Sequence, residues 1–205
     1  MLFSYIVTRD FGFAPNPFPP YCTLATCKPV IRSHAKIDDW VLGVGSAAQN
    51  STMKHRLIYA MQVQEILTYD EYWNDERFYY KRAVMNGSKR QNYGDNIYHS
   101  DQVSGQYIQE NSHHSLPGGI RNVKNYDKDL HSKNVLISKN YWYFGKSAIE
   151  IPAEFLEITK VTQGHLKFDD DNLINRIVSW LNSLPFKGKV DVPYFFEKDF
   201  KRFKG

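Results

Sequence analysis

Apolar and polar positions along the first third of the chain predict short β-strands. Leu2–Arg9 is an almost unbroken apolar run, Cys22–Lys28 is a Thr-rich run, and Trp40–Val44 is a third apolar run. Leu57–Ile66 comes closest to the alternation of apolar and polar side chains that a half-buried strand shows. We therefore predict four strands over these ranges, of which the last is the longest.

Local sequence signals predict a helix in each of two further segments. Thr68, with Glu71 three residues later, fits a capping box and predicts a short helix in the segment TYDEYW. Apolar residues recur at helical spacing from Leu173 to Leu184, and they follow the acidic run 169–171, which suits a helix start. Pro185 is then expected to end this longer helix.

Strands and helices follow one another in an order that predicts an α+β fold. Val135–Ile137 and Tyr141–Phe144 add two short strands, and no regular alternation of strand and helix is visible. The expected architecture is a small mixed, curled β-sheet or barrel, with a short helix after the fourth strand and a longer C-terminal helix.

Domain organisation is predicted to be simple. Residues 1–157 form the main domain, with a long insertion at about 85–133 that is rich in Asn, Gly, Ser, His and Lys. Such irregular stretches inside a domain are usually functional or mobile loops. Residues 158–205 are expected to form a C-terminal helix and a basic, aromatic tail that pack on the same domain.

Composition adds a hint about partners. Aromatic residues make up 15% of the chain, which suits base stacking or a protein interface, although aromatic residues also favour strands. The net charge of +4 permits a polyanionic partner without requiring one. The excess is concentrated in Lys187–Gly205, which holds six Lys/Arg against three acidic residues.

Cysteine usage and the apolar runs indicate a cytoplasmic protein. On an extended strand the Cα atoms of Cys22 and Cys27 would lie roughly 17 Å apart, beyond the reach of a disulfide, so two free thiols are expected. No stretch of about 18 apolar residues occurs, and the first residues lack the pattern of a signal peptide, so no membrane association is expected. No cofactor is predicted.

Three segments carry candidate nucleotide-binding residues. The proline-rich loop after the first strand holds Arg9, Asp10 and Asn16 in a rigid setting. On the second strand Thr26 and Lys28 would share a face, and Lys28 with Arg32 would engage phosphate. The glycine-rich tip GVGSAAQN, which follows Trp40 and contains Ser46, would let backbone N–H groups approach a base or phosphate.

The segment GDNIYH carries the candidate catalytic residues. Asp95 with His99 or His113 would form an acid–base pair, while Asn96 and Tyr98 would read and stack a base. A metal site from His99, His113 and His114 is not predicted, because the spacing matches no known ligand motif. A mobile polar loop is the structural alternative for this segment.

Several of these segments together resemble one family, the nucleotide modification associated domain 2 proteins of bacteria and their phages. The matching stretches cover about residues 2–145 and read FSYIVTRDFGFAPNPF, CTLATCKPVIR, DDWVLGVGS, LIYAMQVQEILTYDEYW, GDNIY and KNVLISKNYWYFG. The resemblance implies a role in making or handling modified nucleotides, and it brings no established catalytic residue. A looser likeness to the small PUA, ASCH and EVE barrels implies a base-binding pocket beside a curled sheet.

The leading hypothesis from the sequence is a protein that binds a nucleotide or a modified or unmodified nucleic-acid base and acts in nucleotide modification or phage–host conflict. It requires the loop around Arg9–Pro17, the GVGS tip and the GDNIY segment to meet at one cavity. The alternatives are an enzyme with an Asp/His acid–base pair and a protein-interaction module in a defence system. The expected partner is a nucleotide or nucleic acid, and the oligomeric state is left open.

Overall fold

A seven-stranded sheet is the largest of the sheets in the computed structural model, which describes residues 1–46, 51–159 and 164–205. Its strands run in the order β11–β1–β3–β4–β9–β12, and β10 pairs with β4 at the side. Most neighbours are antiparallel, whereas β1 pairs with β3, and β9 with β12, in parallel. The strands are β1 (Leu2–Val7), β3 (Trp40–Gly45), β4 (Arg56–Gln62), β9 (Tyr141–Tyr143), β10 (Ile149–Glu150), β11 (His165–Phe168) and β12 (Gly188–Lys189).

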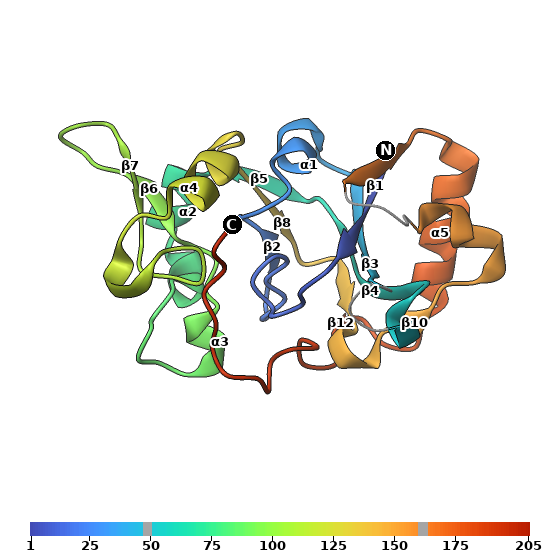
Figure 1. Ribbon diagram of the computed structural model, residues 1–205. Coiled ribbons are helices and arrows are strands. Elements are labelled where there is room, and N and C mark those ends of the chain that lie inside the picture. The colour runs from blue at the N-terminus through green and yellow to red at the C-terminus, as the bar shows by residue number, and fades with distance from the viewer. Residues whose placement is uncertain (47–50, 160–163) are drawn as a thin grey trace.

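Helix α5 (Asp171–Ser183) covers one face of this sheet (Figure 1). Side chains on a strand alternate between faces, so Leu2 of β1 points to the α5 side and Phe3 to the opposite side. The α5 side is packed by the apolar stripe of the helix against the sheet, and its members include Leu42, Trp142, Leu173, Ile177 and Leu181. Asp170 caps the helix by accepting from the backbone N–H groups of Asn172 and Leu173.

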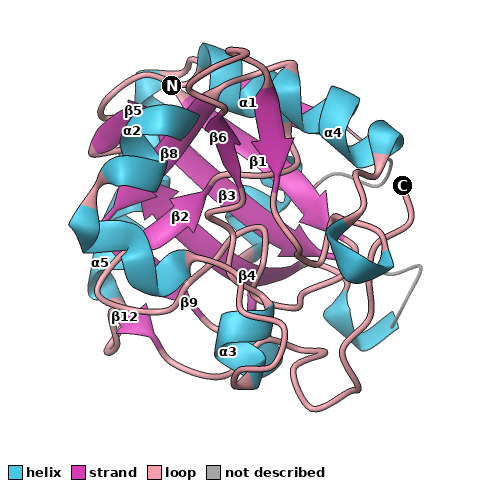
Figure 2. Cartoon of the chain, turned by 90° about the vertical axis from the view of Figure 1, so that its left-hand side faces the viewer, coloured by secondary structure: helices cyan, strands magenta, loops and turns pink. Residues whose placement is uncertain are grey.

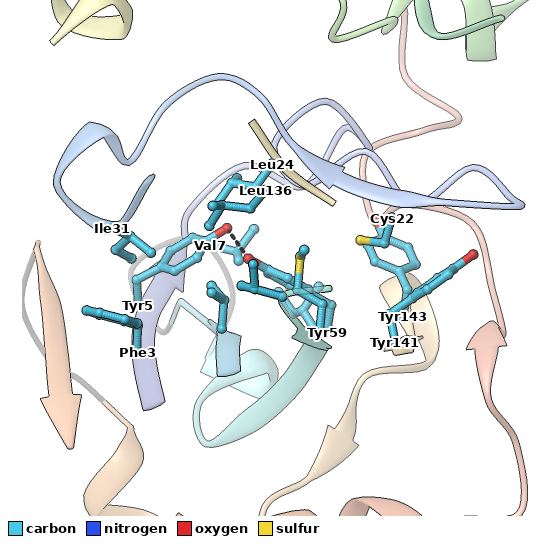
Figure 3. Packing of buried hydrophobic residues seen from close by; sticks show 14 of the residues in the cluster. Phe3, Tyr5, Val7, Cys22, Leu24, Ile31, Tyr59, Leu136, Tyr141 and Tyr143 are labelled. Carbon is cyan, nitrogen blue, oxygen red and sulfur yellow. Dashed lines mark hydrogen bonds between the residues drawn. The ribbon is translucent and has the colours of Figure 1, made fainter. Parts of the chain in front are cut away.

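A second, three-stranded sheet and a short helix cover the other face (Figure 2). This sheet has the order β2–β8–β5, and α1 packs beside it; the elements are β2 (Cys22–Leu24), β5 (Glu65–Thr68), β8 (Asn134–Ser138) and α1 (Pro29–His34). Figure 3 shows the core between the two sheets, where Leu24, Ile31 and Leu136 meet the ring of Tyr5. The Tyr5 and Tyr59 hydroxyls are both buried there and satisfy each other at 2.8 Å.

The remaining elements form a lobe around a third, aromatic-rich core. They are α2 (Tyr69–Asn74), α3 (Lys89–Asn92), α4 (Val123–Leu130), the hairpin of β6 (Tyr98–Ser100) and β7 (Tyr107–Gln109), and 3₁₀ turns η2 (Glu76–Lys81) and η3 (Pro117–Gly119). Three further 3₁₀ turns lie near the large sheet: η1 (Ser51–Met53), η4 (Gly145–Ser147) and η5 (Ala153–Ile158). In Figure 1 the red C-terminal segment runs from β12 past α3, and its end lies against Lys124 and Asn125 of α4.

The predicted α+β class is confirmed, and so is the longer C-terminal helix. The capping box of Thr68 and Glu71 forms as expected and starts α2. In the described residues the path of the large sheet ends at β11 and β12 without closing on itself, so the barrel alternative is wrong and the PUA-like detail has no support. The described helices are all too short or too polar to cross a lipid bilayer.

Two strand predictions are wrong in their bounds. The strand predicted over Cys22–Lys28 stops at Leu24, and the chain then turns into α1, whose first residue is Pro29. The long strand predicted over Leu57–Ile66 is two strands, β4 and β5, because the chain leaves one sheet for the other. The irregular segment 85–133 contains α3, β6, β7 and α4.

Candidate functional site

A strained turn presents Cys27 between β2 and α1. Cys27 has φ of 57° and Lys28 has φ of 38°, so both adopt the left-handed conformation that non-glycine residues seldom take. Such backbone strain persists only where the surrounding structure holds it, and it is concentrated at functional sites. Cys27 is half-buried, whereas Cys22, the other free thiol, is fully buried.

Cys27, His114 and Asp129 form a line of polar contacts. Cys27 Sγ lies 3.6 Å from His114 Nε2, and His114 Nδ1 lies 2.7 Å from Asp129 Oδ2. His114 comes from the loop before η3, and Asp129 comes from the last turn of α4. The side chains of His114 and Asp129 are 3% and 0% exposed, so Cys27 is the member of the three that is most open to solvent.

Asp129 is held by donors on both carboxylate oxygens. The backbone N–H of Cys27 donates to Oδ1 at 2.7 Å, and the Tyr98 hydroxyl donates to Oδ2 at 3.0 Å. Burial opposes the charge of Asp129, but the attraction of His114 and then of Arg32 keeps its pKa below the usual value. The carboxylate is therefore ionised at neutral pH, and the same contacts fix its orientation toward the imidazole.

The imidazole of His114 is biased toward its charged form. Burial lowers the pKa of His114, but the Asp129 carboxylate and the Cys27 sulfur outweigh burial and raise it well above the usual value. The carbonyl of His114 accepts from Asn125 Nδ2 at 2.9 Å, which fixes the backbone of the loop against α4. An imidazolium that faces a thiol favours the thiolate, which is the nucleophilic form of cysteine.

Arg32 ties together the segments that carry Cys27 and Asp129. It is fully buried in α1, and its guanidinium donates to the carbonyls of Cys27 and Asp129 at 2.8 and 2.7 Å. Two further bonds, at 2.6 and 2.7 Å, go to the carbonyls of Ser132 and Asn134 at the start of β8. The planar fork of arginine is needed for such divergent acceptors, since a lysine offers only one nitrogen.

The same three side chains could be considered as metal ligands, because their donor atoms lie within 4.8 Å of one another. However, the two ring nitrogens of His114 face different partners, Nε2 toward the sulfur and Nδ1 toward the carboxylate. The geometry suits a proton relay better than a metal centre.

Several predicted nucleotide-binding residues of the proline-rich loop are buried in structural contacts. Asp10 accepts from the Tyr143 hydroxyl and from the Tyr194 backbone N–H, and burial raises its pKa to about 6. Asn16 accepts from Lys81 Nζ through both its side chain and its carbonyl, at 2.8 and 2.9 Å. Arg9 stays exposed, and its guanidinium lies over an aromatic ring of the C-terminal segment.

The predicted residues on the second strand and the glycine-rich tip are also dispersed. Arg32 points into the protein and is fully buried, while Lys28 lies with its amino group 4.4 Å from the Tyr5 ring centre. Thr26 is fully buried, and Trp40 is a core residue on the α5 side of the large sheet. The glycines of GVGS lie within buried strand β3.

The cavity that two of these segments line is too small for a nucleotide. Asp10 and Ser46 line one cavity, of about 20 Å³, which is room for a single water molecule. The end of the predicted tip, residues 47–50, lies outside the described residues. Asn16 does contact the segment before Asp95, since its side-chain amide donates to the Tyr93 carbonyl at 3.0 Å. However, Asn16 is only 1% exposed, so this contact is part of the protein interior.

The structure does not join the predicted catalytic residues to one another. Asp95 is buried and accepts from Thr23 and Tyr72, and burial raises its pKa. His99 pairs with Glu110 at 2.8 Å on the half-buried edge of the lobe. His113 is buried, with its ring bonded to a main-chain carbonyl and its pKa lowered to about 3 by burial and then by the charge of its neighbour.

The residues predicted to read and stack a base have other partners. Asn96 is buried and donates to the Tyr72 carbonyl at 2.9 Å. Tyr98 is fully buried and binds Asp129, so it supports the Cys27–His114–Asp129 line from within and offers no exposed face for a base.

Cys27 and Asp129 have no site role in the prediction from the sequence, and His114 enters it only as a possible metal ligand that was not adopted. Cys27 and His114 are 87 positions apart, and no spacing motif links them. The one available signal was Lys28-Pro29 after Cys27, since a proline at that point favours a helix start and makes a continued strand less favourable. His113 and His114 could not be distinguished from the sequence.

These features define a class: a mixed α+β protein with a buried histidine–aspartate pair facing a half-buried cysteine. The chain belongs to the nucleotide modification associated domain 2 family, whose profile matches residues 1–200 of the 205. A comparison with curated proteins found no match, and a comparison with solved structures found none either. The family links the chain to nucleotide modification.

Proposed function

We propose that the chain is a cysteine-dependent enzyme acting on a modified nucleotide, with Cys27 as nucleophile. The observation that carries this proposal is the line from Cys27 Sγ through His114 to Asp129. A nucleophile, a base within reach and a group that orients the base make up the arrangement of covalent acyl-transfer enzymes. The nucleotide part of the proposal rests on the family.

Each of the three residues has a definite task. The Cys27 thiolate attacks the carbon of an acyl group on the nucleotide and forms a thioester, while the bond from that carbon to its nitrogen or oxygen breaks. The protonated His114 gives its proton to the departing nitrogen or oxygen. Water then attacks the thioester, His114 removes a proton from that water, and the free acid leaves as Cys27 is restored. Asp129 keeps Nε2 directed at the sulfur throughout.

This proposal replaces the acid–base pair predicted from the sequence. Asp95, His99 and His113 each have other partners in the structure. A pure binding function remains the competitor, because binding of a nucleotide needs no reactive thiol. The discriminating property is therefore the chemical reactivity of Cys27.

Iodoacetamide labelling followed by mass spectrometry tests the proposal. At neutral pH Cys27 of the folded wild type should be labelled faster than a free cysteine, and the His114→Ala variant should slow this labelling by at least about tenfold. Cys22 serves as the internal control, since burial raises its pKa to about 12 and it should react only after unfolding. With p-nitrophenyl acetate, an acetyl group should appear on Cys27 and be absent from Cys27→Ala.

If Cys27 reacts no faster than a free cysteine and its rate does not depend on His114, the enzymatic proposal is wrong.

A further inference from the structure

The ring of Phe203 packs against Arg9, His113 and His114, the last of which contacts the proposed nucleophile. The Arg9 guanidinium lies 5.2 Å from the ring centre of Phe203. The rings of His114 and His113 lie 5.6 and 6.4 Å away, inclined by 33° and 25° to the Phe203 ring. Phe203 is half-buried, and the exposed Arg9 contributes one boundary of its site.

Main-chain contacts hold the segment of Phe203 against the histidines. The backbone N–H of Phe203 donates to the His113 carbonyl at 2.7 Å, and the Phe203 carbonyl accepts from Asn125 Nδ2 at 2.7 Å. The preceding Arg202 donates to the Ser112 carbonyl at 2.6 Å. These bonds place residues 201–204 as a strap across the loop that carries His114.

The chemistry of these three neighbours suits a nucleobase. Contact of a flat ring with a guanidinium and with aromatic rings is a general mode of base recognition, because every base has a π-face and arginine adds a cation–π contact. The charge of Arg9 also suits the phosphate of a nucleotide. The site adjoins His114, whose Nε2 faces the Cys27 sulfur, so a base held there would bring its substituents close to the thiol.

We propose that Phe203 fills a base-binding site formed by Arg9, His113 and His114, and that the base of a nucleotide replaces the Phe203 ring when substrate binds. This deepens the proposed function, on which the assignment of the neighbouring nucleophile rests, by naming the substrate group that is held and the place that holds it. The Phe203 ring competes with the nucleotide for this site. The wild-type protein therefore binds the nucleotide more weakly than a variant that lacks the ring.

Calorimetric titration with AMP, GMP, CMP and UMP tests the competition. The Phe203→Ala variant should bind at least one of the four at least about tenfold more tightly than the wild type. Phe203→Leu, which keeps an apolar side chain without the ring, should also bind more tightly and guards against a folding defect in the alanine variant. Phe186→Ala is the matched control, because Phe186 is 63% exposed and its loss should leave affinity unchanged.

A second substitution locates the bound base. Arg9→Ala, introduced into Phe203→Ala, should remove most of the gained affinity. The nucleotide that binds best should also slow iodoacetamide labelling of Cys27 in Phe203→Ala. The proposal is overturned if neither Phe203 variant binds any of the four nucleotides more tightly than the wild type, or if the gained affinity does not depend on Arg9. Cys27 labelling without nucleotide reads the proposed function separately, so the two ideas fail independently.

Discussion

His113 and His114 stack with their ring centres 5.7 Å apart and their planes inclined by 29°, yet the two rings have opposite electrostatic surroundings. His114 faces the Asp129 carboxylate, which raises its pKa. His113 lies among aromatic rings, and burial lowers its pKa to about 3. At neutral pH the pair therefore carries one positive charge, on the ring that faces Cys27. Titratable neighbours with opposed pKa shifts are a common feature of acid–base sites.

Asp129→Asn should separate the role of the carboxylate from that of the imidazole. The amide cannot stabilise a charged His114, so the imidazolium becomes less favourable and so does the thiolate that it faces. Labelling of Cys27 by iodoacetamide at neutral pH should slow by at least about tenfold. Asp127→Asn, an exposed carboxylate on the same helix, should leave the rate unchanged. Equal rates for Asp129→Asn and the wild type would contradict the proposed relay.

Arg32→Leu should destabilise the whole fold. The substitution removes the donor from four carbonyls, of which those of Asp129 and Ser132 are bonded in buried contacts, and each unsatisfied buried acceptor costs about 1–3 kcal/mol. The free energy of unfolding in urea should fall by at least about 3 kcal/mol. Arg176→Leu is the control: Arg176 is 49% exposed and pairs with Glu154 at the surface, so its loss should cost less than about 1 kcal/mol. A similar small effect at Arg32 would show that water replaces the lost donors.

Local signals were predictable from the sequence because their causes are local. Thr68 and Glu71 lie three residues apart and form their capping box within one turn. The α5 stripe depends only on spacing, and the helix begins at Asp171, the last residue of the acidic run 169–171 that predicted its start. In contrast, β8 and β9 are joined by the two residues 139–140 but belong to different sheets, and no nearby residue encodes that.

The candidate site could not be predicted because it depends on long-range contacts. Cys27 reads as one of two ordinary thiols until the fold brings His114 and Asp129 to it, across 87 and 102 positions. The polar neighbours of Asp95 in the sequence predict a catalytic role, but in the fold Asp95 belongs to a buried hydrogen-bond network. Its burial depends on Thr23 and Tyr72, which are distant in the sequence and donate to its carboxylate.

Asp95→Asn tests whether Asp95 has this structural role. The amide can keep one of the two bonds from Thr23 and Tyr72, but it loses the charge that faces the buried Lys81. The free energy of unfolding should fall by about 1–3 kcal/mol. Cys27 labelling at neutral pH should keep its wild-type rate in the folded variant. Slower labelling in a variant that retains wild-type stability would instead support a catalytic role for Asp95.

His113 should make stability depend on pH in a direction that can be derived from its pKa. In the unfolded chain it takes up a proton below about pH 6.5, whereas in the folded protein burial delays this to about pH 3. The unfolded state therefore binds more protons between these values, and the stabilisation from a neutral His113 is lost as the pH falls, at up to about 1.4 kcal/mol per pH unit. Asn at this position keeps a donor for the Lys201 carbonyl and does not titrate. As the pH falls from about 6 to about 4, the wild type should therefore lose unfolding free energy relative to His113→Asn. The exposed His131→Asn should show a much weaker trend; a difference that stays constant for His113→Asn would mean that His113 is charged in the folded protein.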